Sequence, residues 1–485
     1  MAGHTEPVYF KRARQNGHIV VSDPPKFDLD AYIANYKGRT VFDRLLLIGS
    51  SSSYLYSEAL KLAVKDAKAG SDVGRYDVAT TKLHDIVPED KDGIPDLAWV
   101  DKTSKKSKID SDRLEQELKR YKNNLIHESV RMGYDDLGQH YHNIGDLSNS
   151  HKAYTKMRPS CTTTQHLLIM RLRLLKVAID QQNWIQVQTN VQSIRQTGTK
   201  QPEVEKVTAK LSAAMGLASL ASGNFKEAAK EFLNTDPRMA GAKMDGSDEE
   251  SFNEVVTPND IAVYGGLCAL ASMSREQLQS RVLDNSSFRN YLELEPHIRR
   301  AISFFVSGKY SSCLSILESY KSDYLLDIYL QKHVDTIYYE IRTKALRQYF
   351  IPFSHVTFSA IAAAFDTDEA TIESELTSMI KKDQLDARIN LVDRVLLARK
   401  QNPRSQVHAD ALALAKDYER TAHLRVLRME ILNAGLEVQK AKRRNHDDGG
   451  AWLGNAQDTS LGNSIAGDVF MPTVGKSLRS AYRGG

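Results

Sequence analysis

Two histidines, His140 and His142, are the strongest candidates for metal chemistry in this sequence. Ser150 follows eight residues after the second histidine, which is the spacing of one class of zinc hydrolase. That motif needs an aspartate three residues after the serine, and Ala153 stands there. Catalytic zinc is held by three protein ligands, so two histidines are too few. We expect both histidines to be ordinary helix residues.

A second candidate is the tripeptide Gly475-Lys476-Ser477, which resembles the end of a phosphate-binding loop. The motif needs a glycine five residues before Gly475, and Phe470 occupies that position. No strand pattern precedes the tripeptide, whereas a P-loop follows a strand. The sequence also holds no nucleophile elbow and no HExxH pattern. We therefore expect no catalytic residue, metal or cofactor in this chain.

Two basic clusters could bind an import receptor or phosphate. The first comprises Lys102, Lys105, Lys106 and Lys108, and the second runs from Lys440 to Arg444. The first is favoured as a solvated loop, because runs of charge usually stay in water. The second is explained equally well by cations that complement the C-terminal end of a helix dipole. A nuclear import signal remains the alternative for each.

The composition is that of a globular protein. The chain has 485 residues, 41% hydrophobic and 26% charged, which corresponds to about three domains. A net charge of +4 gives no global reason to expect nucleic-acid or membrane binding. Cys161, Cys268 and Cys313 show no paired spacing, which is typical of a reducing compartment. Without a signal peptide or a run of about 18 apolar residues, we expect a protein of the cytoplasm and nucleus.

The elements that position these residues are mostly helices, and residues 336–402 have the order of a winged helix. A helix up to Phe350 is followed by Pro352, which cannot continue it. A second helix ends at Phe365, and a third is predicted to open at Asp366 with Glu369 as its capping-box partner. Alternating apolar residues from Leu385 and a return strand at 395–398 then predict a β-hairpin.

Residues 111–335 are predicted to form tetratricopeptide-like helical hairpins. Similar junctions begin at Gly145, Gln182, Gly223 and Gly308, and the middle spacings are about 40 residues. Each hairpin has an apolar face that it cannot cover alone, so the hairpins must stack into a right-handed solenoid. An acidic loop is expected at 245–254. Residues 27–110 are predicted to form an N-terminal helical region after a disordered lead-in at 1–26.

A long helix is predicted for residues 403–444, before a disordered tail at 445–485. Its apolar residues lie on more than one face, and one stripe comprises Leu424, Leu427, Ile431 and Val438. A helix that is apolar around so much of its circumference needs several partners. We therefore predict that it enters a helical bundle made by several subunits.

The winged helix is predicted to bind protein and not DNA. The helix that would enter the major groove begins with Asp366, Asp368 and Glu369, which would repel phosphates. A short hairpin leaves an unpaired edge that another subunit's strand can extend. The candidate interface residues of the wing are Leu385, Arg388, Ile389 and Val395. The alternative is an edge that is merely short and solvated.

A solenoid closed by a winged helix resembles the PCI-domain family, and particular residues resemble its COP9 signalosome subunit 1 branch. They are Tyr36-x-Gly38, Arg44-Leu45 and Ile48, then Ile341-Arg342, Ala345-Leu346, Gln348 to Phe350 and Pro352, then Ala362 to Phe365, Glu373-x-Glu375-Leu376 and Ala387 to Ile389. The resemblance covers about residues 27–440. Leu47, Gly49 and Asn390 depart from the family pattern.

This resemblance implies a non-catalytic scaffold subunit of the COP9 signalosome, which removes NEDD8 from cullin-RING ubiquitin ligases. The zinc isopeptidase would be a sibling subunit, and the partners would be other signalosome subunits and cullin-RING components. The nearest alternative is the related PCI subunit of the proteasome regulatory lid. A winged-helix adaptor for nucleic acid is a further alternative, which strongly salt-dependent DNA binding would support.

Overall fold

The computed structural model describes residues 7–88, 90–124, 126–197, 202–236, 252–399 and 403–436. It divides the chain into two units, Met1–Arg399 and Lys400–Gly485. Helices dominate the first unit, and its short strands all belong to one small sheet or to a single bridge. The predicted class, a helical solenoid followed by a winged helix and a long terminal helix, is confirmed. None of the helices in the described ranges is both long and apolar enough to cross a membrane.

The N-terminal region is helical from its first described residues. Its elements are α1 (Val8–Gln15), α2 (Leu29–Ile33), α3 (Arg39–Ser51), α4 (Tyr56–Ala69), α5 (Val73–Ile86), η1 (Lys91–Gly93) and α6 (Leu97–Asn123). The prediction of disorder for the lead-in is therefore wrong from residue 7 onward. Phe10 is fully buried with its ring 5.6 Å from that of Tyr56, and the Val21 amide donates to the Ser51 carbonyl. These partners are distant in sequence, so local composition did not reveal them.

The lysine cluster at 102–108 lies within α6 and not in a loop. Asp96 caps this helix, because its carboxylate accepts a hydrogen bond from the Trp99 amide. Lysine is a good helix former, so a charged run can continue a helix that a cap has started. The boundary predicted between residues 110 and 111 consequently falls inside a continuous helix.

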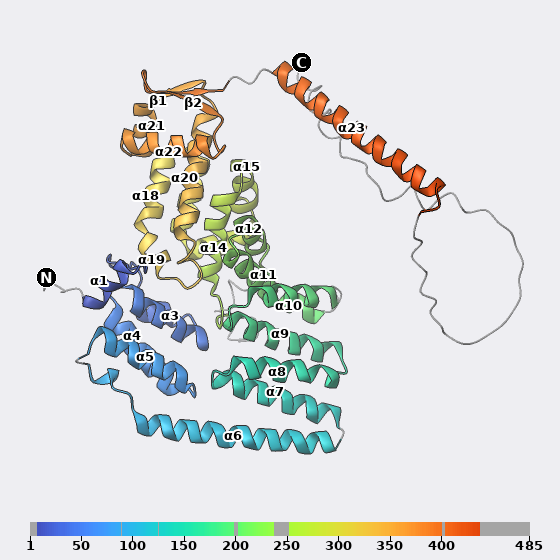
Figure 1. Ribbon diagram of the computed structural model, residues 1–485. Helices are drawn as coiled ribbons and strands as arrows, with labels where there is room; N and C mark the ends of the chain where they lie inside the picture. Colours follow the sequence, from blue (N-terminus) through green and yellow to red (C-terminus); the bar gives the residue numbers. More distant parts are fainter. Residues whose placement is uncertain are drawn as a thin grey trace, which may run out of the picture. The chain divides into compact units, whose positions relative to one another are not determined.

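The helices of the solenoid stack in chain order from α6 onward (Figure 1). They are α7 (His127–Asn143), α8 (Leu147–Met157), η2 (Arg158–Ser160), α9 (Thr164–Asp180), α10 (Trp184–Thr197), α11 (Pro202–Ala221), α12 (Phe225–Leu233), α14 (Pro258–Ser272), α15 (Arg275–Leu278), η3 (Gln279–Leu283), α16 (Ser286–Leu294), α17 (Pro296–Val306), α18 (Tyr310–Ser319), α19 (Lys321–Leu325) and α20 (Val334–Phe350). The described part of the predicted acidic loop is 252–254, and its other residues lie outside the described ranges.

All four predicted helix junctions are present. At each one a residue just past a helix end has positive φ: Gly145, Gln182, Gly223 and Gly308. Glycine adopts this conformation without the strain that a side chain adds. After three of these residues, the next amide bonds to a carbonyl five residues back, as the Asn224 amide does with Ser219. The turn signal in the sequence is therefore a real chain reversal.

The winged helix contains α20, β1 (His355–Thr357), α21 (Phe358–Phe365), α22 (Glu369–Lys381), β2 (Ala387–Asn390) and β3 (Val395–Ala398). The sheet has three antiparallel strands in the order β1-β3-β2, and not the two strands predicted. The predicted capping box at Asp366 is also wrong. Asp366 has a φ of 53° and ends α21, and α22 begins at Glu369 without a side-chain cap.

One hydrophobic core joins the solenoid to the winged helix. It runs from Leu175 on α9 to Leu396 on β3, and α20 contributes residues such as Ile341 and Phe350. The N-terminal region has a separate core, which Leu326 joins from the distant end of α19. A third core holds α6 to α9 together. The winged helix is therefore continuous with the solenoid in its packing.

The second unit is described through one helix, α23 (Pro403–Asn433). It ends earlier than the predicted residue 444. Gly435 has a φ of 65°, and the Leu436 amide bonds back to the Ile431 carbonyl, which closes the helix. The Lys440–Arg444 cluster, the Gly475 tripeptide and the tail predicted to be disordered all lie outside the described residues.

Candidate assembly surfaces

Strand β2 forms one edge of the sheet, because β3 lies between it and β1. Arg388 is exposed on this strand, and Ile389 is half-buried against the core. No other strand pairs with the outer side of β2 among the described residues, so its backbone groups there can accept a further strand. The structure thus places two of the four predicted wing residues on the open edge.

The other two predicted wing residues lie elsewhere. Leu385 is only 8% exposed and belongs to the core beneath the sheet. Val395 is on the central strand, where it pairs with both Thr357 and Asn390. The two-stranded prediction made Val395 an edge residue, whereas β1 covers that side. Neither residue offers an open edge to a partner.

The tip of the wing is an apolar surface that the sequence analysis did not single out. Val392 is 92% exposed in the turn between β2 and β3, and the neighbouring Leu391 is also exposed. Ile351 and Phe353 are also exposed, but they precede β1 and lie at the end of the sheet opposite to this turn. An apolar pair in a tight turn, where polar residues are usual, was the signal that could have identified the tip.

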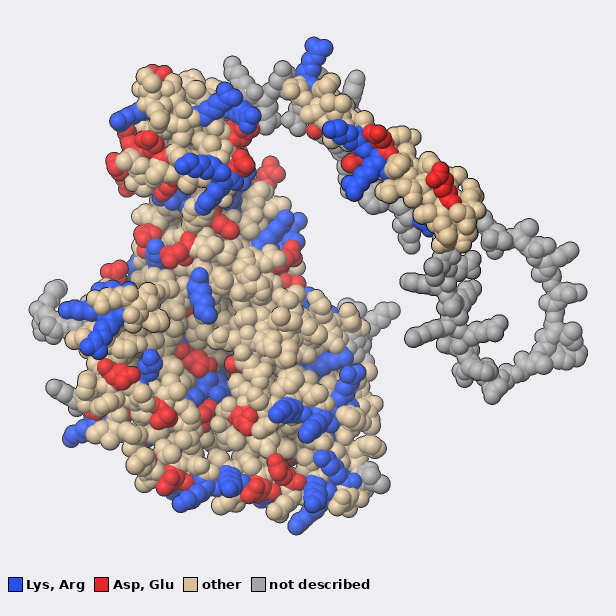
Figure 2. Space-filling model, in the orientation of Figure 1, with Lys and Arg blue, Asp and Glu red and all other residues tan. Residues whose placement is uncertain are grey.

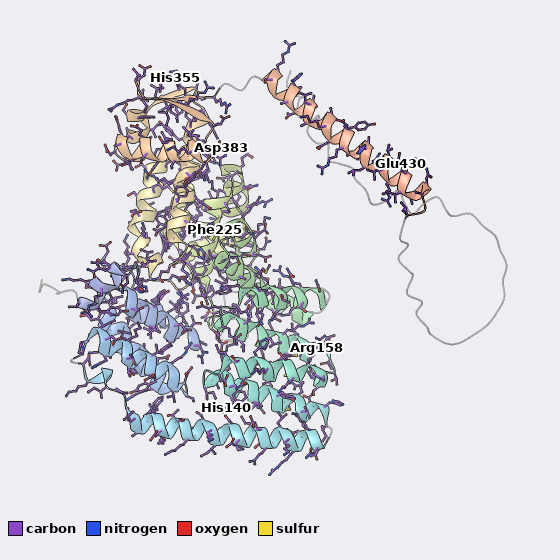
Figure 3. The ribbon with its side chains drawn as sticks, viewed as in Figure 1. His140, Arg158, Phe225, His355, Asp383 and Glu430 are labelled. Atoms are coloured by element: carbon purple, nitrogen blue, oxygen red, sulfur yellow. The ribbon has the colours of Figure 1, made fainter. Side chains whose placement is uncertain are left out.

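Helix α23 buries almost none of its apolar side chains. Leu424, Leu427 and Ile431 of the predicted stripe are all exposed, and Val438 lies outside the described residues. Other exposed apolar residues lie around the helix, and Figure 3 labels the nearby Glu430. They are Val407, Leu412, Leu414, Tyr418, Val426, Met429, Leu432 and Leu436. Because apolar residues occur on all sides, this helix needs an enclosing partner.

A buried ionic network connects the N-terminal region to the solenoid. Arg44 of α3 is fully buried, and its guanidinium lies 3.1 Å from Asp260 of α14 and 2.7 Å from Asp327. Tyr36 donates a hydrogen bond of 2.7 Å to Asp260, and Tyr264 donates one of 2.7 Å to Asp327. Burial raises the pKa of Asp260, and the Arg44 charge opposes this shift.

Tyr36 and Arg44 belong to the sequence block that carries the family resemblance, but sequence reasoning gave them no role. A cavity of about 230 Å³ lies beside them, and Lys26 of the lead-in lines it. The Lys26 ammonium lies 4.0 Å from the centre of the Tyr320 ring, and its amide donates to Asp323. An arginine inside an apolar helix face was the signal for this network. These contacts join α3 to α14 and to Asp327 after α19, so the network is a structural tie between these segments.

The two candidate metal-binding histidines contact different helices. His142 Nε2 lies 2.6 Å from Asp180 Oδ2, and His140 Nε2 lies 2.9 Å from Ser111 Oγ on the side of α7 that faces α6 (Figure 3). Ser150 donates to the Gly138 carbonyl. Across the described residues, no group of three or more His, Cys, Asp or Glu side chains could hold a metal ion. These side chains serve helix packing.

The carboxylates at the start of α22 are partly neutralised within the chain. Glu369 pairs with Arg394 at 3.2 Å, and Glu375 pairs with Arg342 at 2.9 Å. Arg342 and Arg394 therefore face carboxylates of α22 and are not directed at a phosphate ligand. Of the cysteines, Cys268 and Cys313 are buried, and burial raises the pKa of Cys313 to about 12. A thiol with this pKa is not a nucleophile near neutral pH.

Comparisons with known proteins match both halves of the first unit. The model of the 26S proteasome subunit RPN7 family matches residues 96–281, and the PCI domain model matches residues 317–400. The COP9 signalosome complex subunit 1 of Emericella nidulans is 50% identical over 87% of this chain and 85% of its own length. The subunit 1 of Arabidopsis thaliana is 38% identical over 88% of this chain and 95% of its own. The 26S proteasome regulatory subunit RPN7 of Saccharomyces cerevisiae is 23% identical over 56% of this chain.

Proposed function

Because this chain belongs to the COP9 signalosome subunit 1 family, we propose that it is a non-catalytic scaffold subunit of a signalosome. In this role it supports the removal of NEDD8 from cullin-RING ubiquitin ligases, which a sibling zinc isopeptidase subunit carries out. Its partners are the other signalosome subunits, with cullin-RING components as further contacts. It acts in the cytoplasm and the nucleus.

The observation that carries this proposal is the apolar surface of α23. Exposed leucine and isoleucine side chains on several faces of one helix are unfavourable in water, since each loses about 1.5–3 kcal/mol relative to full burial. A bundle of helices from several subunits would cover all of these faces together. The scaffold role therefore gives α23 the partners that its composition requires.

The open edge of β2 supports a second contact. A strand from a neighbouring winged helix would satisfy the free backbone groups of β2, while Val392 at the tip would be buried beside it. The two contacts are complementary. Strand pairing fixes the direction of the neighbour, and the helical bundle supplies most of the apolar area.

Native purification of the tagged full-length chain tests the proposal. We expect mass spectrometry to identify the other signalosome subunits, and the purified complex to remove NEDD8 from a cullin. The isolated chain should not remove NEDD8, since the side chains of His140 and His142 form hydrogen bonds with Ser111 and Asp180. A monomer without companions, or turnover by the isolated chain, would contradict the proposal.

The proteasome lid is the second candidate, because the RPN7 family model matches residues 96–281. The same purification separates the two, since a lid subunit would bring down proteasome ATPases instead of signalosome subunits. The identity of 50% to a signalosome subunit, against 23% to the yeast lid subunit, favours the signalosome. A nucleic-acid adaptor has no comparable support, given the paired carboxylates of α22.

A further inference from the structure

A hollow of about 480 Å³ lies across α6, α7 and α8, away from the winged helix. Figure 2 shows Lys and Arg side chains interspersed with Asp and Glu over α6, along the lower edge of the view. The hollow is lined by Glu115, Leu118, Lys119 and Lys122 of α6, Tyr134, Leu137 and Tyr141 of α7, and Asn149, Lys152, Ala153 and Lys156 of α8. The surfaces proposed for assembly contribute no residue to it.

The floor of the hollow is apolar and fixed. Leu118, Tyr134, Leu137 and Ala153 are all buried, and the first three belong to the core that holds α6 to α9 together. These side chains are held by packing, so the floor keeps its shape without a ligand. A small apolar side chain of a partner could rest on it.

The rim at one end of the hollow is basic. Lys119 and Lys122 lie three residues apart on α6, and Lys152 and Lys156 lie four residues apart on α8, so each pair shares a helix face. All four are exposed, and no carboxylate forms an ion pair with any of them in the described ranges. Like charges that line the same rim repel one another, and an anionic ligand there would relieve that repulsion.

The contacts that these lysines do make leave their charges unbalanced. The Lys122 ammonium lies 4.9 Å from the centre of the Tyr134 ring, and Lys152 Nζ donates to Asn149 Oδ1 at 3.3 Å. Neither partner carries a charge. The long lysine side chains can therefore turn toward a carboxylate at little energetic cost.

The opposite end of the hollow has the reverse sign. Glu115 accepts a hydrogen bond of 2.7 Å from Tyr141, and Asp146 caps α8 by accepting from the Asn149 amide. Glu115 is the acidic residue that lines the hollow and it precedes Lys119 and Lys122 on α6, so charge changes sign along this side of the groove. A long polyanion such as a nucleic acid would meet Glu115 as it continued, whereas a short acidic segment would not.

We propose that this hollow binds a short acidic peptide segment of a partner protein, with carboxylates at the lysine end and one apolar side chain on the floor. The proposal goes beyond the scaffold function and does not depend on it. It identifies a separate docking surface on the N-terminal half of the solenoid. The charge pattern fits a peptide that carries several Asp or Glu residues around one Leu.

The test measures fluorescence anisotropy of a fluorescein-labelled peptide, a run of Glu and Asp with one central Leu, on the purified full-length chain. We expect saturable binding that weakens about tenfold when Lys119→Glu and Lys156→Glu are combined. The control combines Lys105→Glu with Lys108→Glu, which makes the same change of charge on α6 outside the hollow. The control should bind as the unchanged chain does.

Several results would overturn the proposal. The first is that the peptide shows no saturable binding to the unchanged chain, and the second is that both double variants weaken binding equally. The third is that a single-stranded oligonucleotide of equal charge displaces the labelled peptide at the same concentration that unlabelled peptide needs. Should the glutamate variant unfold in circular dichroism, Lys119→Gln with Lys156→Gln decides the question. That pair removes the charges without reversing them, and the exposed side chains are not needed for folding.

Discussion

Arg44 Nη1 lies 2.7 Å from Asp327 Oδ2, and this buried ion pair joins residues that are 283 positions apart in the sequence. A second bond from the same guanidinium reaches Asp260. The planar guanidinium offers donors to both carboxylates at once, which a lysine could not do in the same geometry. Arg44 therefore binds two distant segments of the solenoid at once, within an interface that other contacts, such as that of Tyr36 with Asp260, also support.

Replacing Arg44 with methionine should destabilise the protein strongly. Asp260 and Asp327 would then be buried without a cation, and loss of one partner from a buried pair typically costs about 3–5 kcal/mol. We expect hydrogen exchange to rise first in α3 to α5, because these helices lose their tie to α14. Lys61→Met is the matched control, since it breaks the surface pair with Asp90. Unchanged exchange in α3 to α5 of Arg44→Met would show that apolar packing alone holds this region.

Lys344 should make stability depend on pH. Burial on α20 lowers the pKa of Lys344 from 10.5 to about 7. Between those values the folded chain binds fewer protons than the unfolded chain, so stability increases as pH rises from about 7. Below that range both states are charged, and the full penalty for burying the ammonium applies. Lys344→Met should remove this dependence and raise stability at pH 7 by about 1–3 kcal/mol.

Thermal unfolding measured at pH 7 and at pH 9 checks the Lys344 prediction. The unchanged chain should gain stability at the higher pH relative to Lys344→Met. An equal response in both proteins would mean that the hydrogen bond from the ammonium to the Leu270 carbonyl compensates for burial.

Aspartates on α23 should release the chain from its complex. Leu427→Asp with Ile431→Asp places two charges on the apolar stripe, which would be buried in a bundle. Co-purification of other subunits should fall at least tenfold, while circular dichroism shows that the solenoid remains folded. Lys416→Asp with Arg420→Asp has the same spacing on the same helix and serves as the control. Global unfolding of the first variant would mean that α23 packs within its own chain.

A charge at the tip of the wing should weaken assembly without affecting the fold. Val392 is almost fully exposed, so Val392→Glu removes no internal contact. If the tip is buried against a neighbouring subunit, the variant complex should be less stable than the unchanged complex. It should dissociate at a lower salt concentration, or after less dilution, as measured by mass photometry. Ile185→Glu, an exposed apolar position on α10, is the control. Equal stability of both complexes would show that the tip stays in solvent.

Local patterns predicted much of this fold. The four chain reversals were predicted because similar junction segments recur along the chain, and at three of them a glycine such as Gly145 or Gly223 adopts the positive φ that the turn needs. Helices α21 and α22 of the winged helix followed from their apolar periodicity. Strand β1 was missed because three residues after Pro352 are too few to show any period. The error moved Val395 to an edge that β1 occupies.

Long-range contacts could not be predicted in the same way. Nothing near Phe10 shows that Tyr56 will cover it, and nothing near Arg44 indicates Asp260 or Asp327. The basic hollow is similar, since its lysines come from α6 and α8, which are separated by the whole of α7. Charge patterns on single helices are visible in the sequence, but their convergence depends on how the helices stack.

The continuous core from Leu175 to Leu396 determines how the wing responds to mechanical load. Helix α20 passes from the solenoid into the winged helix without a hinge, so a pull on the sheet is transmitted along its axis into the repeats. A neighbouring subunit bound at the wing would therefore be connected rigidly to the solenoid. The position of that neighbour would then depend on how the solenoid helices from Leu175 onward stack.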